Sequence, residues 1–111
     1  MYMAEVMQWE GTPTVAFRVF KKCEVNTQQK RIPETTINVD ELKLKAYYVC
    51  AMDSSGNTRQ MFIPYTQAGK DALYSTFLNR HFVFAKLEGT EIPFETDGFQ
   101  QVWQEVSRPA L

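Results

Sequence analysis

The chain has 111 residues, a formal net charge of −1, 44% hydrophobic residues and 14% aromatic residues. This length is typical of one domain, so a multidomain enzyme is excluded, and the chain is too apolar and too weakly charged to be a disordered tail. A chain of this size buries about 65% of the surface that its unfolded form exposes, which is enough for one hydrophobic core. We therefore expect a single soluble domain over residues 1–111.

No apolar run approaches the roughly 20 residues that are needed to cross a bilayer. The first residues do not show a basic segment followed by an apolar one, so no secretion signal is visible. These observations predict a cytoplasmic protein without a membrane partner. The two cysteines, Cys23 and Cys50, could pair, but a cytoplasmic location favours reduced, half-buried thiols.

Charge is distributed unevenly along the chain. Residues 1–10 contain two acids and no base, residues 11–86 contain eleven Lys or Arg against six acids, and residues 87–111 contain five acids against one Arg. A basic body with an acidic end is compatible with an anionic partner for the body, and equally with an ordinary solvated surface.

The N-terminal segments predict a β-hairpin followed by a loop. Tyr2–Trp9 alternates loosely and Thr14–Phe20 is rich in β-branched and aromatic residues, so both predict strands, with the turn at Gly11–Pro13. Residues 26–40 are polar, contain a proline and show no helical period. We expect a long polar loop there, which is either functional or a simple surface excursion.

Leu42–Met52 is the clearest strand in the chain. Its even-numbered residues form an apolar face, and its odd-numbered residues, which include Lys43, Lys45 and Tyr47, form the opposite face. Residues 53–57 predict a turn, and Thr58–Ile63 predicts the returning strand of a second hairpin.

The next segments predict a helix and a covered strand. Thr66 is a candidate N-cap for a helix over Gln67–Asn79. His81–Leu87 predicts a strand, and its nearly continuous apolar character suggests that both of its faces are covered.

The C-terminal part predicts an edge strand and a short helix. Residues 90–96 have an extended pattern, and Asp97 followed by Gln100 resembles a capping box. Apolar residues at i, i+3, i+4 and i+7 over Phe99–Val106 predict an amphipathic helix.

The order of these elements predicts an α+β fold. We expect an antiparallel sheet of about five to six strands, either covered by helices on one side or curled into a small OB-like barrel. One mid-chain helix and a short C-terminal amphipathic helix complete the predicted architecture.

The sequence shows no motif for catalysis, a metal or a cofactor. It contains one histidine and no closely spaced cysteine or histidine pairs, and its glycines are scattered rather than clustered into a phosphate-binding loop. A dyad between His81 and a cysteine has no local support. We therefore expect a binding protein that is not an enzyme, with no metal and no cofactor.

Aromatic residues alternate with basic residues in several segments, for example Phe17–Lys22 and Arg80–Lys86. This pattern is typical of proteins that bind single-stranded nucleic acid, in which bases stack on rings while Lys and Arg neutralise phosphates. The residues predicted to form this site are Arg18, Lys21, Lys22, Lys30, Arg31, Lys43, Lys45, Tyr47 and Arg59. The alternative is a solvated strand face on which Tyr47 packs against a neighbour.

Several segments resemble bacterial single-strand-DNA-binding proteins. Thr14–Val19 is similar to the first-strand core of that family, and Arg59–Ile63, the helix ending at Arg80 and Phe82–Gly89 are similar to its strand, helix and following strand. The resemblance covers half of the chain and implies an OB fold and single-stranded DNA binding. This sequence departs from the family in its additional strand at Leu42–Met52, and it lacks the glycine-rich tail and the terminal acidic-apolar peptide.

A second hypothesis is a protein–protein interaction module or an inhibitor, such as those that phages and plasmids encode. Its predicted surface is the acidic segment 88–111, in which Trp103 is either an interface anchor or a residue that closes the core. The residues of this alternative site are Glu88, Glu91, Glu95, Asp97 and Trp103. A homodimer is also compatible with the sequence.

Overall fold

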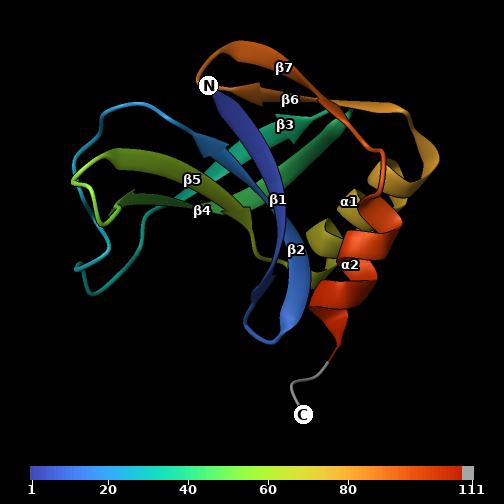
Figure 1. Cartoon of the computed structure of the whole chain (residues 1–111), viewed down its shortest axis with the longest axis horizontal. Helices are drawn as coiled ribbons and strands as arrows, with labels where there is room; N and C mark the ends of the chain where they lie inside the picture. Colours follow the sequence, from blue (N-terminus) through green and yellow to red (C-terminus); the bar gives the residue numbers. More distant parts are fainter. Residues whose placement is uncertain (109–111) are drawn as a thin grey trace.

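Seven strands form one antiparallel sheet, and two helices pack against it (Figure 1). The computed structural model describes residues 1–108. The elements are β1 (Tyr2–Trp9), β2 (Thr12–Val19), β3 (Glu34–Val39), β4 (Leu42–Met52), β5 (Thr58–Pro64), α1 (Gln67–Asn79), β6 (Phe82–Leu87), β7 (Thr90–Glu95) and α2 (Phe99–Ser107). The strand order is β1-β2-β5-β4-β3-β6-β7. The expected α+β class is confirmed, with seven strands rather than five to six.

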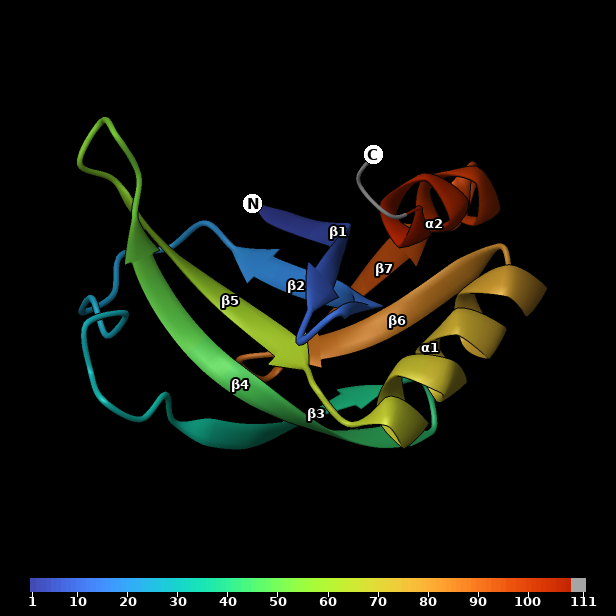
Figure 2. The same cartoon turned by 90° about the horizontal axis from the view of Figure 1, so that it is seen from below.

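The sheet curves into half of a barrel, and its inner face carries the main core (Figure 2). Alternation along each strand points one set of side chains inward, where they meet apolar side chains of α1 and α2. The buried members of this core are Val15, Phe17, Val19, Ile37, Val39, Leu44, Ala46, Phe62, Leu73, Phe77, Val83, Ala85, Leu87, Phe94 and Phe99. Both helices therefore lie on the inner side, and neither covers the opposite, outer face of the sheet. Part of that outer face carries a second, smaller buried group.

The expected loop at 26–40 is only partly a loop, because residues 34–39 form β3. Its alternation is short, and only Ile37 and Val39 are apolar and buried. β3 pairs with β4 on one side and with β6 on the other. Four of its six residues, Thr35, Thr36, Ile37 and Val39, are β-branched, a strand signal that the interpretation as a polar loop overlooked.

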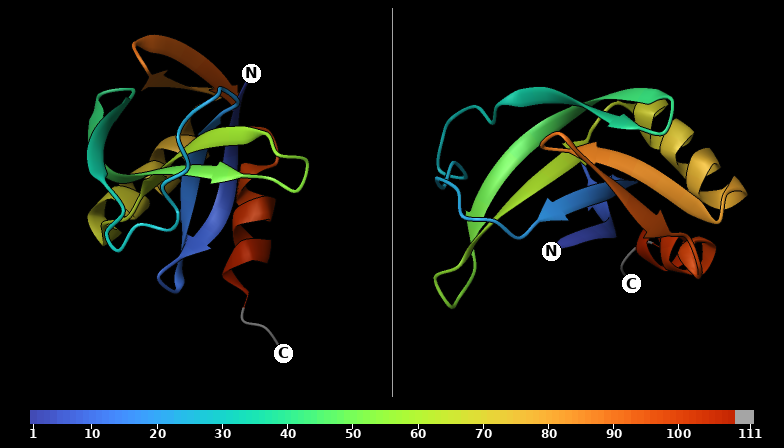
Figure 3. Two further views of the ribbon diagram at one scale, coloured as in Figure 1. Left: turned by 90° about the vertical axis from the view of Figure 1, so that its left-hand side faces the viewer. Right: turned by 90° about the horizontal axis from the view of Figure 1, so that it is seen from above.

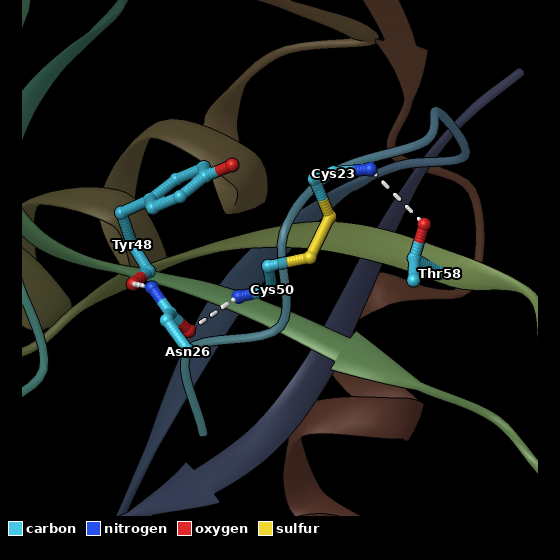
Figure 4. Close-up of a disulfide and its surroundings, with 5 residues drawn as sticks. All are labelled: Cys23, Asn26, Tyr48, Cys50 and Thr58. Carbon is cyan, nitrogen blue, oxygen red and sulfur yellow. Dashed lines mark hydrogen bonds between the residues drawn. A yellow bond between two sulfur atoms is a disulfide. The ribbon is translucent and has the colours of Figure 1, made fainter. Parts of the chain in front are cut away.

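Cys23 and Cys50 form a disulfide, so the expectation of reduced thiols was wrong (Figure 4). The segment 20–33 runs beside β4, where Asn26 replaces a neighbouring strand. The Asn26 main-chain N–H donates to the Cys50 carbonyl at 3.1 Å, the Cys50 N–H donates to Asn26 Oδ1 at 2.8 Å, and Asn26 Nδ2 donates to the Tyr48 carbonyl at 3.1 Å. These bonds bring Cys23 close to β4. Disulfides are typical of non-reducing compartments, so the cytoplasmic location stays a prediction.

The segment 20–33, which the disulfide joins to β4, and the tip of the β4–β5 hairpin lie at one end of the sheet, and the two helices lie at the other end (Figure 3). Among residues 1–108, neither helix is long and apolar enough to span a membrane.

Of the predicted helix and hairpin ends, the cap of α1 is confirmed, whereas the capping box of α2 and the first turn differ from the prediction. Thr66 caps α1 as expected, because its Oγ1 accepts a hydrogen bond from the Gly69 N–H at 3.0 Å. The capping box at Asp97 was wrong, because α2 begins after Gly98, which has a φ of 75° and makes no side-chain cap. The first hairpin turns at Glu10 and Gly11, earlier than expected, and Pro13 lies inside β2.

Candidate nucleic-acid interface

The outer face of β3, β4 and β6 carries exposed lysines and phenylalanines. The inward residues of these strands are buried in the core, and the side chains between them point outward. On β6, Phe82 is 50% exposed and Phe84 is 41% exposed. The expectation that both faces of this strand are covered was therefore wrong, because both helices lie on the other side of the sheet. We call this group the outer strip; it consists of Thr36, Asn38, Lys43, Lys45, Phe82, Phe84 and Lys86.

Strand register brings the three lysines of the outer strip together. Asn38 on β3 pairs with Lys43 on β4 and with Lys86 on β6, and Thr36 pairs with Lys45. Neighbouring strands lie about 4.8 Å apart, so the Cα atoms of Lys43 and Lys86 are separated by about 10 Å across β3. All three lysines are exposed, and none of them takes part in the ion pairs found within residues 1–108.

The backbone beneath Phe84 is held by the turn between β3 and β4. The Asp40 N–H donates to the Phe84 carbonyl at 2.7 Å, and the Phe84 N–H donates to Asp40 Oδ1 at 3.2 Å. Arg80 binds Asp40 at 3.0 Å and Glu41 at 2.5 Å, and its hydrogen bond lowers the pKa of Glu41. The phenylalanine strand is therefore fixed in place, while the nearby Arg80 is already neutralised by two carboxylates.

Tyr47 lies on the same outer face but is packed rather than free. Its ring stacks on Tyr65 at 4.2 Å and contacts Trp9 at 5.7 Å, measured between ring centroids. We call these three residues the aromatic cluster. Tyr47 and Trp9 pack against a small buried group that contains Ala16, Val49 and Ile63. The Tyr65 hydroxyl donates to Glu34 at 2.9 Å, which raises the pKa of Tyr65. Tyr47 therefore takes the packing role that was the alternative to a stacking platform.

Arg18 and Arg59 are bound to acidic neighbours and lie away from the outer strip. Arg18 on β2 pairs with Glu5 at 2.8 Å. Arg59 pairs with Asp53 at 2.8 Å and lies over the ring of Phe20 at 5.3 Å. Hydrogen bonds from Ser55 and Arg59 hold the pKa of Asp53 well below its usual range. Both arginines therefore have local structural roles.

The remaining predicted cations lie on the segment 20–33. Lys21 and Lys22 line an open pocket of about 750 Å³ beside Arg59, and Lys21 pairs with Glu88 at 3.2 Å. Lys30 and Arg31 are exposed, and Arg31 pairs with Glu34 at 3.5 Å. Of the predicted nucleic-acid residues, only Lys43 and Lys45 belong to the outer strip.

The outer strip also contains residues that the predicted site lacked, namely Phe82, Phe84 and Lys86. The alternation of Phe82, Phe84 and Lys86 along one strand is visible in the sequence. This segment is part of the aromatic-basic pattern in the sequence, but the predicted site does not include its residues, because the intervening residues are also apolar and suggest a strand buried on both sides. A strand with a phenylalanine face and an aliphatic face can equally have its aromatic side exposed.

The acidic residues of the alternative site are spread over several places. Glu88 is bound to Lys21, and Glu91 lies opposite Lys86 on the outer face. Glu95 and Asp97 lie together beside a groove between β1 and α2. Trp103 packs against Tyr74 and Phe99, with ring centroids 5.0 and 5.5 Å apart, so it helps to close the core rather than standing free.

No group of three or more His, Cys, Asp or Glu side chains within residues 1–108 could hold a metal ion. A comparison of the chain with protein-family models, curated proteins and solved structures finds no match. The functional interpretation therefore depends on the geometry of the surface alone.

Proposed function

We propose that this protein is a non-enzymatic binding protein that holds single-stranded nucleic acid on the outer strip. The observation that carries the proposal is the exposure of Phe82 and Phe84 beside Lys43, Lys45 and Lys86, which lie outside the ion pairs of the described residues. Bases stacked on such rings contribute about 1–3 kcal/mol each, and the lysines neutralise phosphates along the strand. This mode of binding has no base-specific contacts.

The shape of the surface favours a single strand over a duplex. In a duplex the faces of the bases are stacked on one another, and proteins contact the base edges with a helix or a β-ribbon that enters a groove. The outer strip lies on the convex side of a curved sheet, without a protruding helix or loop among Thr36–Lys45 and Phe82–Lys86. The exposed rings of Phe82 and Phe84 can stack on unpaired bases. The expected partner is therefore the same as the one that the resemblance to single-strand-DNA-binding proteins implies.

The test is a fluorescence-anisotropy titration of a labelled oligothymidine at about 50 mM and about 200 mM salt. For single strands, the slope of log K against log[salt] is about −0.7 for each phosphate that is neutralised. Three lysines therefore predict a slope of about −2. The triple variant Lys43→Glu, Lys45→Glu, Lys86→Glu should bind at least about 100-fold more weakly at the lower salt. Its melting temperature should stay close to that of the parent because the lysines are exposed.

The matched control is Lys22→Glu, a charge reversal of an exposed lysine on the segment 20–33. This variant should keep nearly the full affinity. If the triple variant and the parent bind equally well, or if the parent shows no salt-dependent binding, then the outer strip is not a nucleic-acid site.

A further inference from the structure

β1 is an edge strand, and half of its backbone groups have no partner strand. It pairs only with β2 within residues 1–108. The Phe20 N–H donates to the Met1 carbonyl at 3.0 Å, and hydrogen-bonded pairs alternate along an antiparallel ladder. The odd-numbered residues of β1 therefore bond to β2, and the N–H and C=O groups of Ala4 and Val6 point toward the free edge.

This free edge borders an apolar groove. The groove has a volume of about 320 Å³ and lies between β1, the end of β7 and the start of α2. Ala4 and Val6 line it on the β1 side, Phe77 and Phe99 line its floor, and Val102 of α2, which is 43% exposed, lines its rim. The groove therefore combines unpaired backbone groups with an apolar floor, which is what an added strand requires.

The other edge of the sheet is protected, whereas β1 is not. Beside the end of β7, the Thr96 N–H donates to the His81 carbonyl at 3.1 Å, and hydrogen-bonded pairs alternate along the β6–β7 ladder. The even-numbered residues of β7 therefore bond to β6, and the nitrogen of Pro93 points toward the free edge. Pro93 cannot donate a hydrogen bond, and it is flanked by Glu91 and Glu95, which is a common protection against unwanted strand pairing. β1 contains no proline and no lysine.

The rim of the groove is acidic. Glu95 and Asp97 line it, both side chains are exposed, and neither belongs to the ion pairs found in the described part of the chain. Glu5 also lines the groove but is bound to Arg18. The two open carboxylates favour a basic residue on whatever occupies the groove.

We propose that β1 accepts an extended, basic-flanked segment of a partner protein by β-strand addition. Backbone hydrogen bonds to Ala4 and Val6 hold the segment, alternate apolar side chains enter the groove, and a Lys or Arg of the segment pairs with Glu95 or Asp97. A second copy of this chain adding its own β1 fits less well, because residues 1–10 contain two acids and no base. The unpaired backbone groups and the apolar floor of this surface lie outside the outer strip, and only Glu95 on its rim borders the strip, because it pairs with Phe82. The peptide experiment therefore tests this proposal without reference to nucleic-acid binding.

The probe is a short synthetic peptide in which valine alternates with threonine, with a lysine at each end. Two control peptides carry a central proline or glutamates in place of the lysines. We expect the first peptide to shift the amide NMR signals of Ala4 and Val6 and to slow their hydrogen exchange. Both controls should bind at least about tenfold more weakly, because the proline interrupts the backbone hydrogen bonds and the glutamates meet an acidic rim.

Two variants of the protein sharpen the test. Val102→Arg places a bulky positive charge on the exposed rim and should weaken binding of the lysine peptide at least about tenfold. Gln104→Arg adds the same charge to α2 at an exposed position outside the groove and should have no effect. The proposal is overturned if the proline peptide binds as well as the first, or if the amides of Ala4 and Val6 do not respond at about 1 mM peptide. Protection of these amides by self-association, without peptide, would likewise overturn it.

Discussion

Two groups of aromatic side chains share the outer face of the sheet and differ in what surrounds them. In the aromatic cluster, Tyr47 stacks on Tyr65 and contacts Trp9 over a buried apolar group. In the outer strip, Phe82 and Phe84 are half exposed and are accompanied by lysines. The comparison shows that an aromatic residue next to a lysine offers a free ring face only when no other part of the chain covers it.

The segment 20–33 contributes to this difference, together with Trp9 and Tyr65. Its Ile32 packs against the buried group beneath the aromatic cluster, and the segment is tied to β4 by the disulfide and by Asn26. No comparable segment crosses β6. One half of the outer face is therefore closed by the side chains of Trp9, Tyr65 and Ile32, and the other half stays open.

The largest expected effect comes from removing the tether. The double variant Cys23→Ser, Cys50→Ser opens a loop with a sequence separation of 27, which should lower the free energy of unfolding by about 3–4 kcal/mol. Urea denaturation measures this loss. Oligothymidine affinity of the folded variant should be unchanged, because the outer strip does not depend on the segment.

A reducing agent provides the control for the disulfide. It should lower the denaturation midpoint of the parent and leave that of the serine variant unchanged. A fall in oligothymidine affinity as large as the fall in stability would mean that the closed half takes part in binding.

The next-largest effect distinguishes the phenylalanines of the outer strip from the aromatic cluster. Phe82→Ala with Phe84→Ala should weaken oligothymidine binding by about 1–3 kcal/mol for each stacked base, with little change in melting temperature. Tyr47→Ala should do the reverse. It should lower the free energy of unfolding by about 1–3 kcal/mol, less than for a fully buried ring, and leave the affinity intact. Equal losses of affinity in both variants would contradict the distinction between an open and a closed group.

The smallest effect concerns the β4–β5 hairpin, which lies outside both aromatic groups. Asp53 accepts hydrogen bonds from Ser55 and Arg59, and its pKa is lowered in the folded state. Its contribution to stability is therefore present above the unfolded pKa of about 3.9 and is lost as the pH falls below that value. Asp53→Asn should remove this part of the acid dependence in thermal melts from about pH 5 to about pH 2. An unchanged acid profile would show that the Asp53 turn does not stabilise the hairpin.

The pattern of single segments predicted much of the fold. Alternation over Leu42–Met52 predicted both the strand and the outward position of Lys43 and Lys45, and the outward position follows from the period of two alone. The cap at Thr66 and the apolar spacing of Phe99–Val106 predicted the two helices for the same reason, because these signals act within a few residues.

The pairing of β3 with β6 and the disulfide depend on partners that are distant in sequence. β3 has four β-branched residues and a two-residue connection to β4, so the strand itself is visible in the sequence, whereas its pairing with β6 is not. Cys23 reaches Cys50 because Asn26 bonds to the edge of β4. A pattern within one segment contains no information about either contact.

The sequence by itself determined which side chains of each strand share a face, since alternation is a property of the local backbone. Only the tertiary structure decided which of those faces meet. β3 inserts between β4 and β6 and joins Lys43 to Lys86 across Asn38, while Trp9 and Tyr65 pack against Tyr47 and leave Phe82 and Phe84 open. Strand order and loop path are set by long-range packing against one shared core, and for that reason the candidate surface became visible only in the folded chain.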